Sequence, residues 1–148
     1  MNVKKILFAT DFSHTGDAAL ALATSLARDT GATLHIVHVE EPPVAYGGGE
    51  MYYGLPDPDV DNLKEMLSKV VPTDDNVPYV HHMMTGTPAS AICRLAKDED
   101  VDMIVMGTHG RTGVMRVLMG SVTEVVVRRA PCPVLTYKQQ SETTAEAT

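Results

Sequence analysis

The sequence predicts an α/β fold, a single-domain, Rossmann-like five-stranded parallel open sheet with helices on both faces. Three observations lead to this class. The chain has 148 residues, and one domain takes about 100–200. Apolar residues make up 44% and charged residues 21%, which is ordinary for a globular protein. Short apolar runs alternate with helical patterns in the order β-α-β-α-β-α-β-α-β, which favours a parallel sheet.

The expected strands are short apolar runs, and they cover residues 3–9, 32–39, 79–85, 101–106 and 134–137. In the second run the apolar residues do not alternate strictly with polar ones, as expected for a strand buried on both faces. Pro78 stands just before the third run, where a proline does not interrupt a ladder. The carboxyl ends of such strands form the binding crevice of an open α/β sheet.

The first two expected helices have recognisable ends. Ser13 or Thr15 could cap the first, and Gly31 suits the left-handed position after its end. Asp57 followed by Pro58 resembles a cap and a first helical residue for the second. Spacing at i, i+3, i+4 and i+7 predicts the buried faces. These are Ala19, Leu22, Ala23 and Leu26 in the first helix, and Val60, Leu63, Leu67 and Val70 in the second.

The third and fourth helices follow the third and fourth strands. Thr87 and Pro88 begin the third helix, and Ser121 begins the fourth, which Pro131 and Pro133 end. The third helix is expected to face inward with Ala89, Ile92, Leu95 and Ala96.

Two segments fit neither helix nor strand. Residues 40–56 contain three prolines, three successive glycines and three tyrosines, and a loop of this length is usually functional or disordered. Residues 139–148 have no apolar periodicity and are expected to be a disordered tail. The domain therefore spans residues 1–138.

The net charge of −7 argues against binding to a nucleic-acid backbone, and no basic stripe interleaved with aromatic residues is present. The imbalance lies in residues 40–75, which hold nine acidic residues and two lysines. Residues 107–129 carry four arginines, two of which (Arg111 and Arg116) lie between glycines, against one glutamate. Because residues 107–129 carry a net positive charge, they would not repel the phosphates of a single nucleotide.

Composition also predicts a cytoplasmic protein without membrane insertion. No apolar stretch reaches the length of about 18 residues that spans a bilayer, and the apolar start is too short for a secretory signal. The two cysteines, Cys93 and Cys132, form no zinc motif and suit a reducing compartment as buried thiols.

A glycine-rich loop at the exit of the fourth strand is the strongest functional signal. Glycines let backbone N–H groups approach an anion, and the following helix begins at Ser121, where its dipole favours negative charge. The hydroxyls of Ser121 and Thr123 could add hydrogen bonds to a phosphate. The spacing is neither a Walker A loop nor G-x-G-x-x-G. The alternative is an ordinary turn followed by a capping box made by Ser121 and Glu124.

The same residues resemble a known family. Gly107-x-x-Gly110, nine residues and then Gly120-Ser121 match the glycine signature of universal stress proteins, in the branch that binds ATP. The segments 6–13 and 130–135 also look typical of this family, and the similarity runs over residues 2–138.

The resemblance implies a sheet of order 3-2-1-4-5, a homodimer formed through Val134–Tyr137, and ATP as the ligand. Asp11, as a carboxylate at a strand end, could also help to hold a Mg²⁺ ion. The resemblance also implies phosphates at the glycines and at the start of the fourth helix, ribose or adenine near Asp11, and adenine against the main chain of Val39. The implied site residues are Ala9, Thr10, Asp11, Val39, Met106, Gly107, His109, Gly110, Gly120, Ser121, Val122 and Thr123.

Other readings remain open at this point. Asp11 also suits a turn or a helix cap, and His109 also suits a plain loop. The four histidines at 35, 38, 81 and 82 disfavour a metal site, because neighbours on each strand point to opposite faces. No catalytic constellation stands out, and His109 and Asp11 are the only plausible candidates for a base or a group that orients water. The leading hypothesis is an ATP-binding regulator of the stress response, whose loops 40–56 and 107–120 are ordered by nucleotide. The alternatives are a slow ATPase and a partner-binding module without nucleotide turnover.

Overall fold

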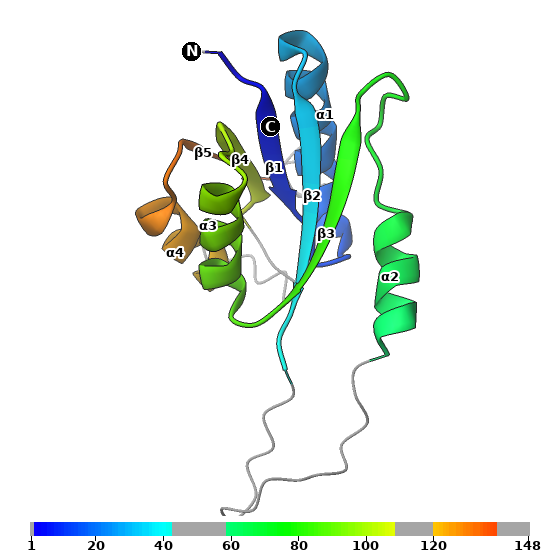
Figure 1. Ribbon diagram of the computed structural model, residues 1–148, viewed down its shortest axis with the longest axis vertical. Coiled ribbons are helices and arrows are strands. Elements are labelled where there is room, and N and C mark those ends of the chain that lie inside the picture. Colours follow the sequence, from blue (N-terminus) through cyan, green and yellow to red (C-terminus); the bar gives the residue numbers. More distant parts are fainter. Residues whose placement is uncertain (1, 43–58, 109–119, 139–148) are drawn as a thin grey trace, which may run out of the picture.

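A computed structural model describes residues 2–42, 59–108 and 120–138. Its described residues form one parallel sheet in the order β3-β2-β1-β4-β5, which confirms the expected class and strand order (Figure 1). The strands are β1 (Lys5–Ala9), β2 (Thr33–Glu40), β3 (Tyr79–Thr85), β4 (Met103–Gly107) and β5 (Val134–Tyr137). The helices are the 3₁₀ turn η1 (His14–Gly16), α1 (Asp17–Thr30), α2 (Val60–Ser68), α3 (Pro88–Asp98) and α4 (Ser121–Arg129).

The helices form two layers, with α1 and α2 on one face of the sheet and α3 and α4 on the other (Figure 1). The central strand β1 contributes to both cores. Ile6 and Phe8 pack with the α1 side, and Leu7 packs with the α3 and α4 side. The three middle residues of β1 are thus buried on both faces of the sheet, which explains why Ile6 to Phe8 form a continuous apolar run.

Three strands differ in their bounds from expectation: β2 and the end of β4 are shifted by one residue, and hydrogen bonds explain the later starts of β1 and β4. β1 begins at Lys5 rather than at residue 3, and the N–H groups of Lys4 and Lys5 donate to the Asp102 carboxylate at 2.8 and 3.0 Å. β4 begins at Met103 rather than at residue 101, because the Val101 N–H closes α3 by donating to the Ala96 carbonyl. The expected bounds of β3 and β5 are confirmed.

The caps of the first two helices differ from expectation. α1 begins at Asp17 after a 3₁₀ turn, and neither Ser13 nor Thr15 caps it, since its N-cap residue is Gly16. The helix ends at Gly31 in the left-handed conformation, as expected, with φ of 77°. α2 is capped by Asp59, whose Oδ1 accepts from the Asn62 N–H at 3.1 Å. Asp57 and Pro58 lie outside the described residues.

The buried helix faces agree with the pattern for α3 and only in part for the others. All four expected residues of α3 are buried. In α1 the fully buried residues are small ones, so Thr24 and Ala27 replace Leu22 and Leu26 in the closest contact with the sheet. In α2 only Leu67 is fully buried and Val60 is exposed, because a short helix at the sheet edge is covered on one side alone.

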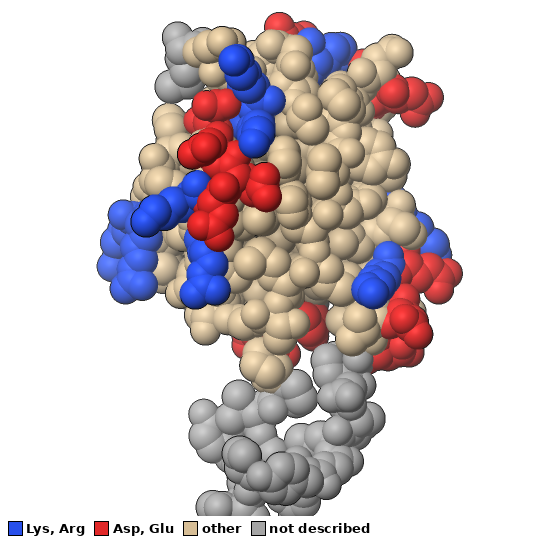
Figure 2. All heavy atoms as spheres, viewed as in Figure 1, with Lys and Arg blue, Asp and Glu red and all other residues tan. Residues whose placement is uncertain are grey.

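Charge is unevenly spread over the surface. Figure 2 shows acidic and basic side chains at the edges of one face, with a wide uncharged area between them. Acidic side chains gather over α2, where Asp59, Asp61 and Glu65 are exposed. No helix of the described part is long and apolar enough to cross a membrane.

The four strand histidines lie on opposite faces of the sheet, as expected. His35 Nδ1 lies 2.8 Å from His82 Nε2 on the α3 side. On the α1 side, His38 contacts Thr10 and Glu40, and His81 Nε2 lies 2.7 Å from the Val70 carbonyl oxygen. Among the described residues, no group of three or more potential metal ligands comes together.

The His35–His82 pair should make stability depend on pH. Burial lowers the pKa of both residues, and for His35 the charge of His82 adds to this effect. The unfolded chain therefore takes up protons at higher pH, near the ordinary histidine value of about 6.5, and the free energy of unfolding falls as pH drops from there towards the folded pKa values.

We expect His82→Gln to flatten this dependence in urea denaturation between about pH 5 and 8. His14→Gln is the control, because His14 is fully exposed. Parallel pH profiles for wild type and His82→Gln would contradict the assignment.

Both cysteines are free thiols and half-buried rather than buried as expected, and they pack against the core beneath α3 and α4. Burial raises the pKa of both thiols, so neither is activated as a nucleophile.

Candidate functional site

A cavity of about 440 Å³ opens at the carboxyl ends of β1, β2 and β4. This volume is within the range of about 300–1,000 Å³ found for small-molecule sites. The chain leaves β1 towards β2 on one side, and β4 lies on the other, so the cavity sits where the strand order reverses. Open α/β sheets bind their ligands at this point.

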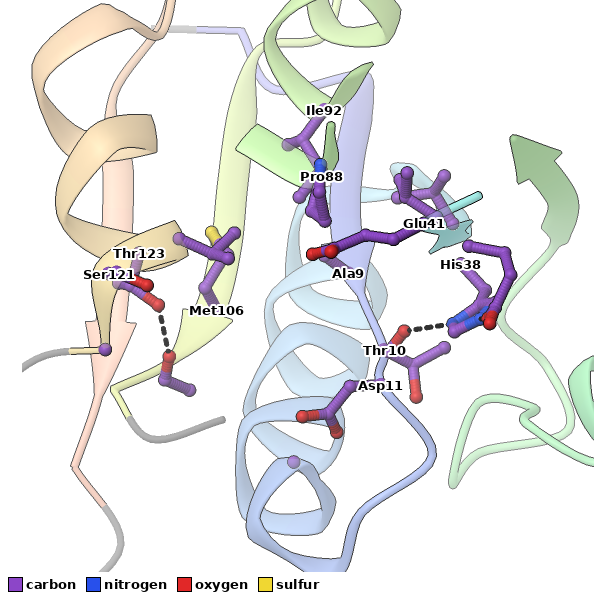
Figure 3. Close-up of a pocket in the computed structure, with 17 residues that line it drawn as sticks. Ala9, Thr10, Asp11, His38, Glu41, Pro88, Ile92, Met106, Ser121 and Thr123 are labelled. Carbon is purple, nitrogen blue, oxygen red and sulfur yellow. Dashed lines mark hydrogen bonds and ion pairs between the residues drawn. The ribbon is translucent and has the colours of Figure 1, made fainter. Parts of the chain in front are cut away.

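Ten of the twelve expected site residues line this cavity, and they come from four separate segments (Figure 3). His109 and Gly110 lie outside the described residues. The ten are Ala9, Thr10, Asp11, Val39, Met106, Gly107, Gly120, Ser121, Val122 and Thr123.

The start of α4 forms one side of the cavity. Gly120 is the N-cap residue and Ser121 the first helical residue, and no side chain caps the helix. The expected capping box is therefore wrong, and Glu124 instead pairs with Arg128 one turn later. The reason is register, since Ser121 stands one position too late to cap. The first N–H groups of α4 keep no side-chain acceptor from a cap, which suits an anion.

Two hydrogen bonds join α4 to β4. The Thr123 hydroxyl donates to the Gly107 carbonyl oxygen at 3.0 Å, and the Gly120 N–H donates to the Thr108 carbonyl oxygen. The single hydroxyl proton of Thr123 is thus used within the protein in this structure, and the expected hydrogen bond from this hydroxyl to a phosphate stays a prediction. The bonds hold the amino end of the helix against the end of the strand.

Asp11 lies across the cavity from α4, at the end of β1 (Figure 3). Its Oδ1 accepts hydrogen bonds from the N–H, at 2.9 Å, and from the hydroxyl of Ser13. The carboxylate therefore shapes the turn after β1, which is the alternative role expected from the sequence, and it also lines the cavity. The two roles do not exclude each other.

The wall between these two sides is apolar. Met106 and Ile92 are nearly fully buried, and Val37, Val39 and Pro88 complete this lining. Such a surface suits a flat, uncharged ring rather than a charged group.

The cavity contains negatively charged side chains and the positive end of a helix. Three carboxylates line it, those of Asp11, Glu40 and Glu41, and no lysine or arginine does so among the described residues. Within that part of the chain, positive potential comes from the start of α4. Arg111 and Arg116, which stand between the glycines in sequence, lie outside the described residues.

Seven residues that line the cavity were not predicted from the sequence. Val37, His38, Glu40 and Glu41 flank Val39 at a strand end, and this position alone could have suggested them. Pro88 and Ile92 come from α3, and Gly16 comes from the turn before α1. Only the crossover connections bring these three to the cavity, so no local signal could have found them.

Comparisons with known proteins place this chain in a family. Residues 2–138 match the model of the universal stress protein family. A universal stress protein of Methanocaldococcus jannaschii is 33% identical over 141 residues, which cover 92% of this chain and 82% of that protein.

Solved structures share the fold. The universal stress protein UspA from Lactobacillus plantarum has a TM-score of 0.71 at 25% identity, covering 92% of this chain and 98% of that one. The universal stress protein from Archaeoglobus fulgidus, solved in complex with dAMP, has a TM-score of 0.67 at 27% identity, covering 92% and 98%. The chain therefore belongs to the universal stress protein family.

Proposed function

We propose that this protein binds ATP in the cavity described above and acts as a nucleotide-dependent regulator in a stress response. The observation that carries the proposal is the start of α4, which is uncapped by any side chain and opens on an apolar-walled cavity at the strand-order reversal. An anion-binding end next to an apolar wall matches a phosphate chain attached to an aromatic base.

Different lining residues would contact the phosphates, the adenine and the ribose of the nucleotide. The N–H groups at Ser121, Val122 and Thr123, with the backbone at Gly107, would hold phosphates. Met106 and the main chain of Val39 would meet adenine, and Asp11 would accept ribose hydroxyls. The dAMP bound by the Archaeoglobus fulgidus relative supports an adenine nucleotide as the ligand class.

Mg²⁺ with the nucleotide fits the donors present only in part. Magnesium in nucleotide sites takes one or two carboxylates, substrate phosphates and several waters. Asp11 supplies one such carboxylate, with Oδ1 already accepting from Ser13. In this proposal the ion would arrive with the phosphates.

Hydrolysis is expected to be slow or negligible. A hydrolase needs a base or a group that orients water. Of the two sequence candidates, Asp11 is engaged by Ser13, and His109 lies outside the described residues. The alternatives remain a slow ATPase and a partner-binding module that does not turn nucleotide over.

The decisive experiment is to denature the purified protein and identify the released nucleotide, followed by calorimetric titration of the emptied protein with ATP, ADP and AMP. Binding of ATP supports the proposal. Failure to bind any of the three would overturn it and leave the partner-binding module. Product formation at rates typical of dedicated ATPases would favour the enzyme.

We also propose a homodimer through β5, in the cytoplasm. β5 is the outermost strand beside β4, and Leu135 and Tyr137 on it are 37% and 38% exposed. An edge strand with exposed apolar side chains is a template for pairing with a second copy. We expect Leu135→Lys to convert a dimer into a monomer in analytical ultracentrifugation, with an unchanged circular dichroism spectrum. A wild-type monomer, or a dimer that persists in the variant, would contradict this interface.

A further inference from the structure

His38 lies in the cavity wall between two hydrogen-bond acceptors (Figure 3). Its Nδ1 lies 2.9 Å from the Thr10 carbonyl oxygen and its Nε2 lies 2.8 Å from Glu40 Oε2. The side chain is 1% exposed, so water cannot replace either partner. A buried polar group in this position needs both contacts satisfied.

The two contacts determine how many protons the His38–Glu40 pair holds. A carbonyl oxygen only accepts, so Nδ1 must donate to Thr10. A neutral ring would then face the Glu40 carboxylate with a bare nitrogen, and two sets of lone pairs would meet at 2.8 Å. A proton between Nε2 and Glu40 removes this conflict. The 2.8 Å separation fits a charge-assisted N⁺–H···O⁻ hydrogen bond, so that proton belongs to the ring.

This proton count changes the charge of the cavity. The charged and titratable groups around His38 are Glu40 on its own strand, and Asp11 and Glu41 in the cavity lining. On β3 its register partner is the uncharged Met83, and His81 is bonded to Val70. A charged His38 neutralises Glu40, so one of the three cavity carboxylates no longer opposes an anionic ligand.

His38 also ends the ladder between β1 and β2. The Thr10 N–H donates to the Val37 carbonyl oxygen at 2.9 Å. In a parallel pair the next bond would run from the Val39 N–H to the Thr10 carbonyl. No such backbone bond forms between these two described residues, and the His38 ring donates to that carbonyl instead. The main chain of Val39 is thereby released from the ladder, at the cavity wall.

The turn that follows depends on the same ring. Phe12 has a φ of 68°, which is unfavourable for a bulky residue. Its ring centroid lies 4.1 Å from that of His38, and its N–H donates to Thr10 Oγ1 at 3.0 Å. Contact with His38 thus helps to hold a strained turn that carries Asp11 into the cavity.

We infer that His38, doubly protonated and paired with Glu40, is a positioning residue of this cavity: it donates to Thr10, neutralises Glu40 and leaves the Val39 amide available to a ligand. Only the last step, contact of that amide with an adenine base, rests on the proposed function. The others concern the protein alone.

The proton count can be tested without ligand. Long-range ¹H–¹⁵N spectra of the full chain at neutral pH should show both ring nitrogens of His38 protonated. The pattern of a neutral ring, with one bare nitrogen, would overturn the inference. Glu40→Gln should shift the Nε2 signal and leave the Nδ1 contact in place.

Amide exchange tests the positioning role. In wild type the Val39 N–H should exchange at least about tenfold faster than that of Val37, because it lacks a ladder bond. His38→Leu removes the donor, so the Val39 N–H can bond to Thr10 and its exchange should slow by about tenfold. His38→Asn places an amide donor where Nδ1 stood and should restore the wild-type rate. His81→Asn, outside the cavity, is the matched control.

Nucleotide titration completes the test. AMP affinity should fall about tenfold in His38→Leu and recover in His38→Asn. If wild type binds no nucleotide, the proposed function fails while the spectra and exchange rates still decide the role of His38. If His38→Leu does not fold, the wild-type spectrum and the wild-type exchange rates decide it. A Val39 amide as protected as Val37 would overturn the positioning role.

Discussion

Replacing Ser121 by aspartate should weaken ATP binding by about 100-fold while leaving the protein equally or more stable. Ser121 is the first residue of α4, and its backbone is part of the helix end that we assign to the phosphates. A carboxylate there sets like charges together, which costs several kcal/mol, and each 1.4 kcal/mol is about tenfold in affinity. The same carboxylate favours the helix dipole by about 0.3–1 kcal/mol.

The prediction is specific because ATP affinity should fall while stability stays the same or rises. A damaged fold would lower affinity and stability together, whereas charge at the phosphate site lowers affinity alone. Ser121→Asn is the matched control, because it has the size of aspartate without its charge, and its affinity should stay within about threefold of wild type. Calorimetric titration and thermal denaturation measure the two quantities. Equal ATP affinity of Ser121→Asp and Ser121→Asn would contradict the assignment of the phosphates to the start of α4.

Replacing Leu7 by alanine should lower the free energy of unfolding by about 2–5 kcal/mol. Leu7 is 0% exposed on the central strand and packs with the core beneath α3 and α4. Its neighbours belong to a rigid sheet that cannot collapse into the space left by the side chain, so a cavity remains. Since a domain is stable by only about 5–15 kcal/mol, this loss is a large share of the total.

Urea denaturation of Leu7→Ala measures this effect, with an unchanged m-value as evidence that the unfolding reaction is the same. Val80→Ala is the control. Val80 is 43% exposed on the outer strand β3, and its replacement should cost less than about 1 kcal/mol. A similar loss in both variants would contradict the assignment of Leu7 to a closely packed core.

Most of the fold could be predicted because its signals are local. The apolar runs of β3 and β5, the Thr87–Pro88 start of α3 and the glycine that ends α1 each lie within a few residues of the feature they predict. Strand ends were less predictable. Whether Val101 belongs to β4 depends on its N–H closing α3, a competition between two elements that no single segment contains.

In the candidate site, too, some features could be predicted from the sequence and others could not. The glycine loop, Asp11 and Val39 were found from the sequence, since each follows a strand and the carboxyl ends of parallel strands share one edge. The hydrogen bond from the Thr123 hydroxyl to the Gly107 carbonyl oxygen was not predicted, because Gly107 stands sixteen residues earlier in the chain. The capping box failed by one residue of register, which the pattern of residue types alone does not specify.

The sequence by itself determined the family, the order of elements and the segments that meet at the crevice. These follow from side-chain periodicity and from spacing along the chain. Only the tertiary structure decided which polar atoms remain available there. The Thr123 hydroxyl donates to the Gly107 carbonyl oxygen, and the Thr10 carbonyl oxygen accepts from the ring of His38. Hydrogen-bond partners brought together by crossovers compete for each donor and acceptor, and the outcome depends on distances in space that the linear order of residues does not contain.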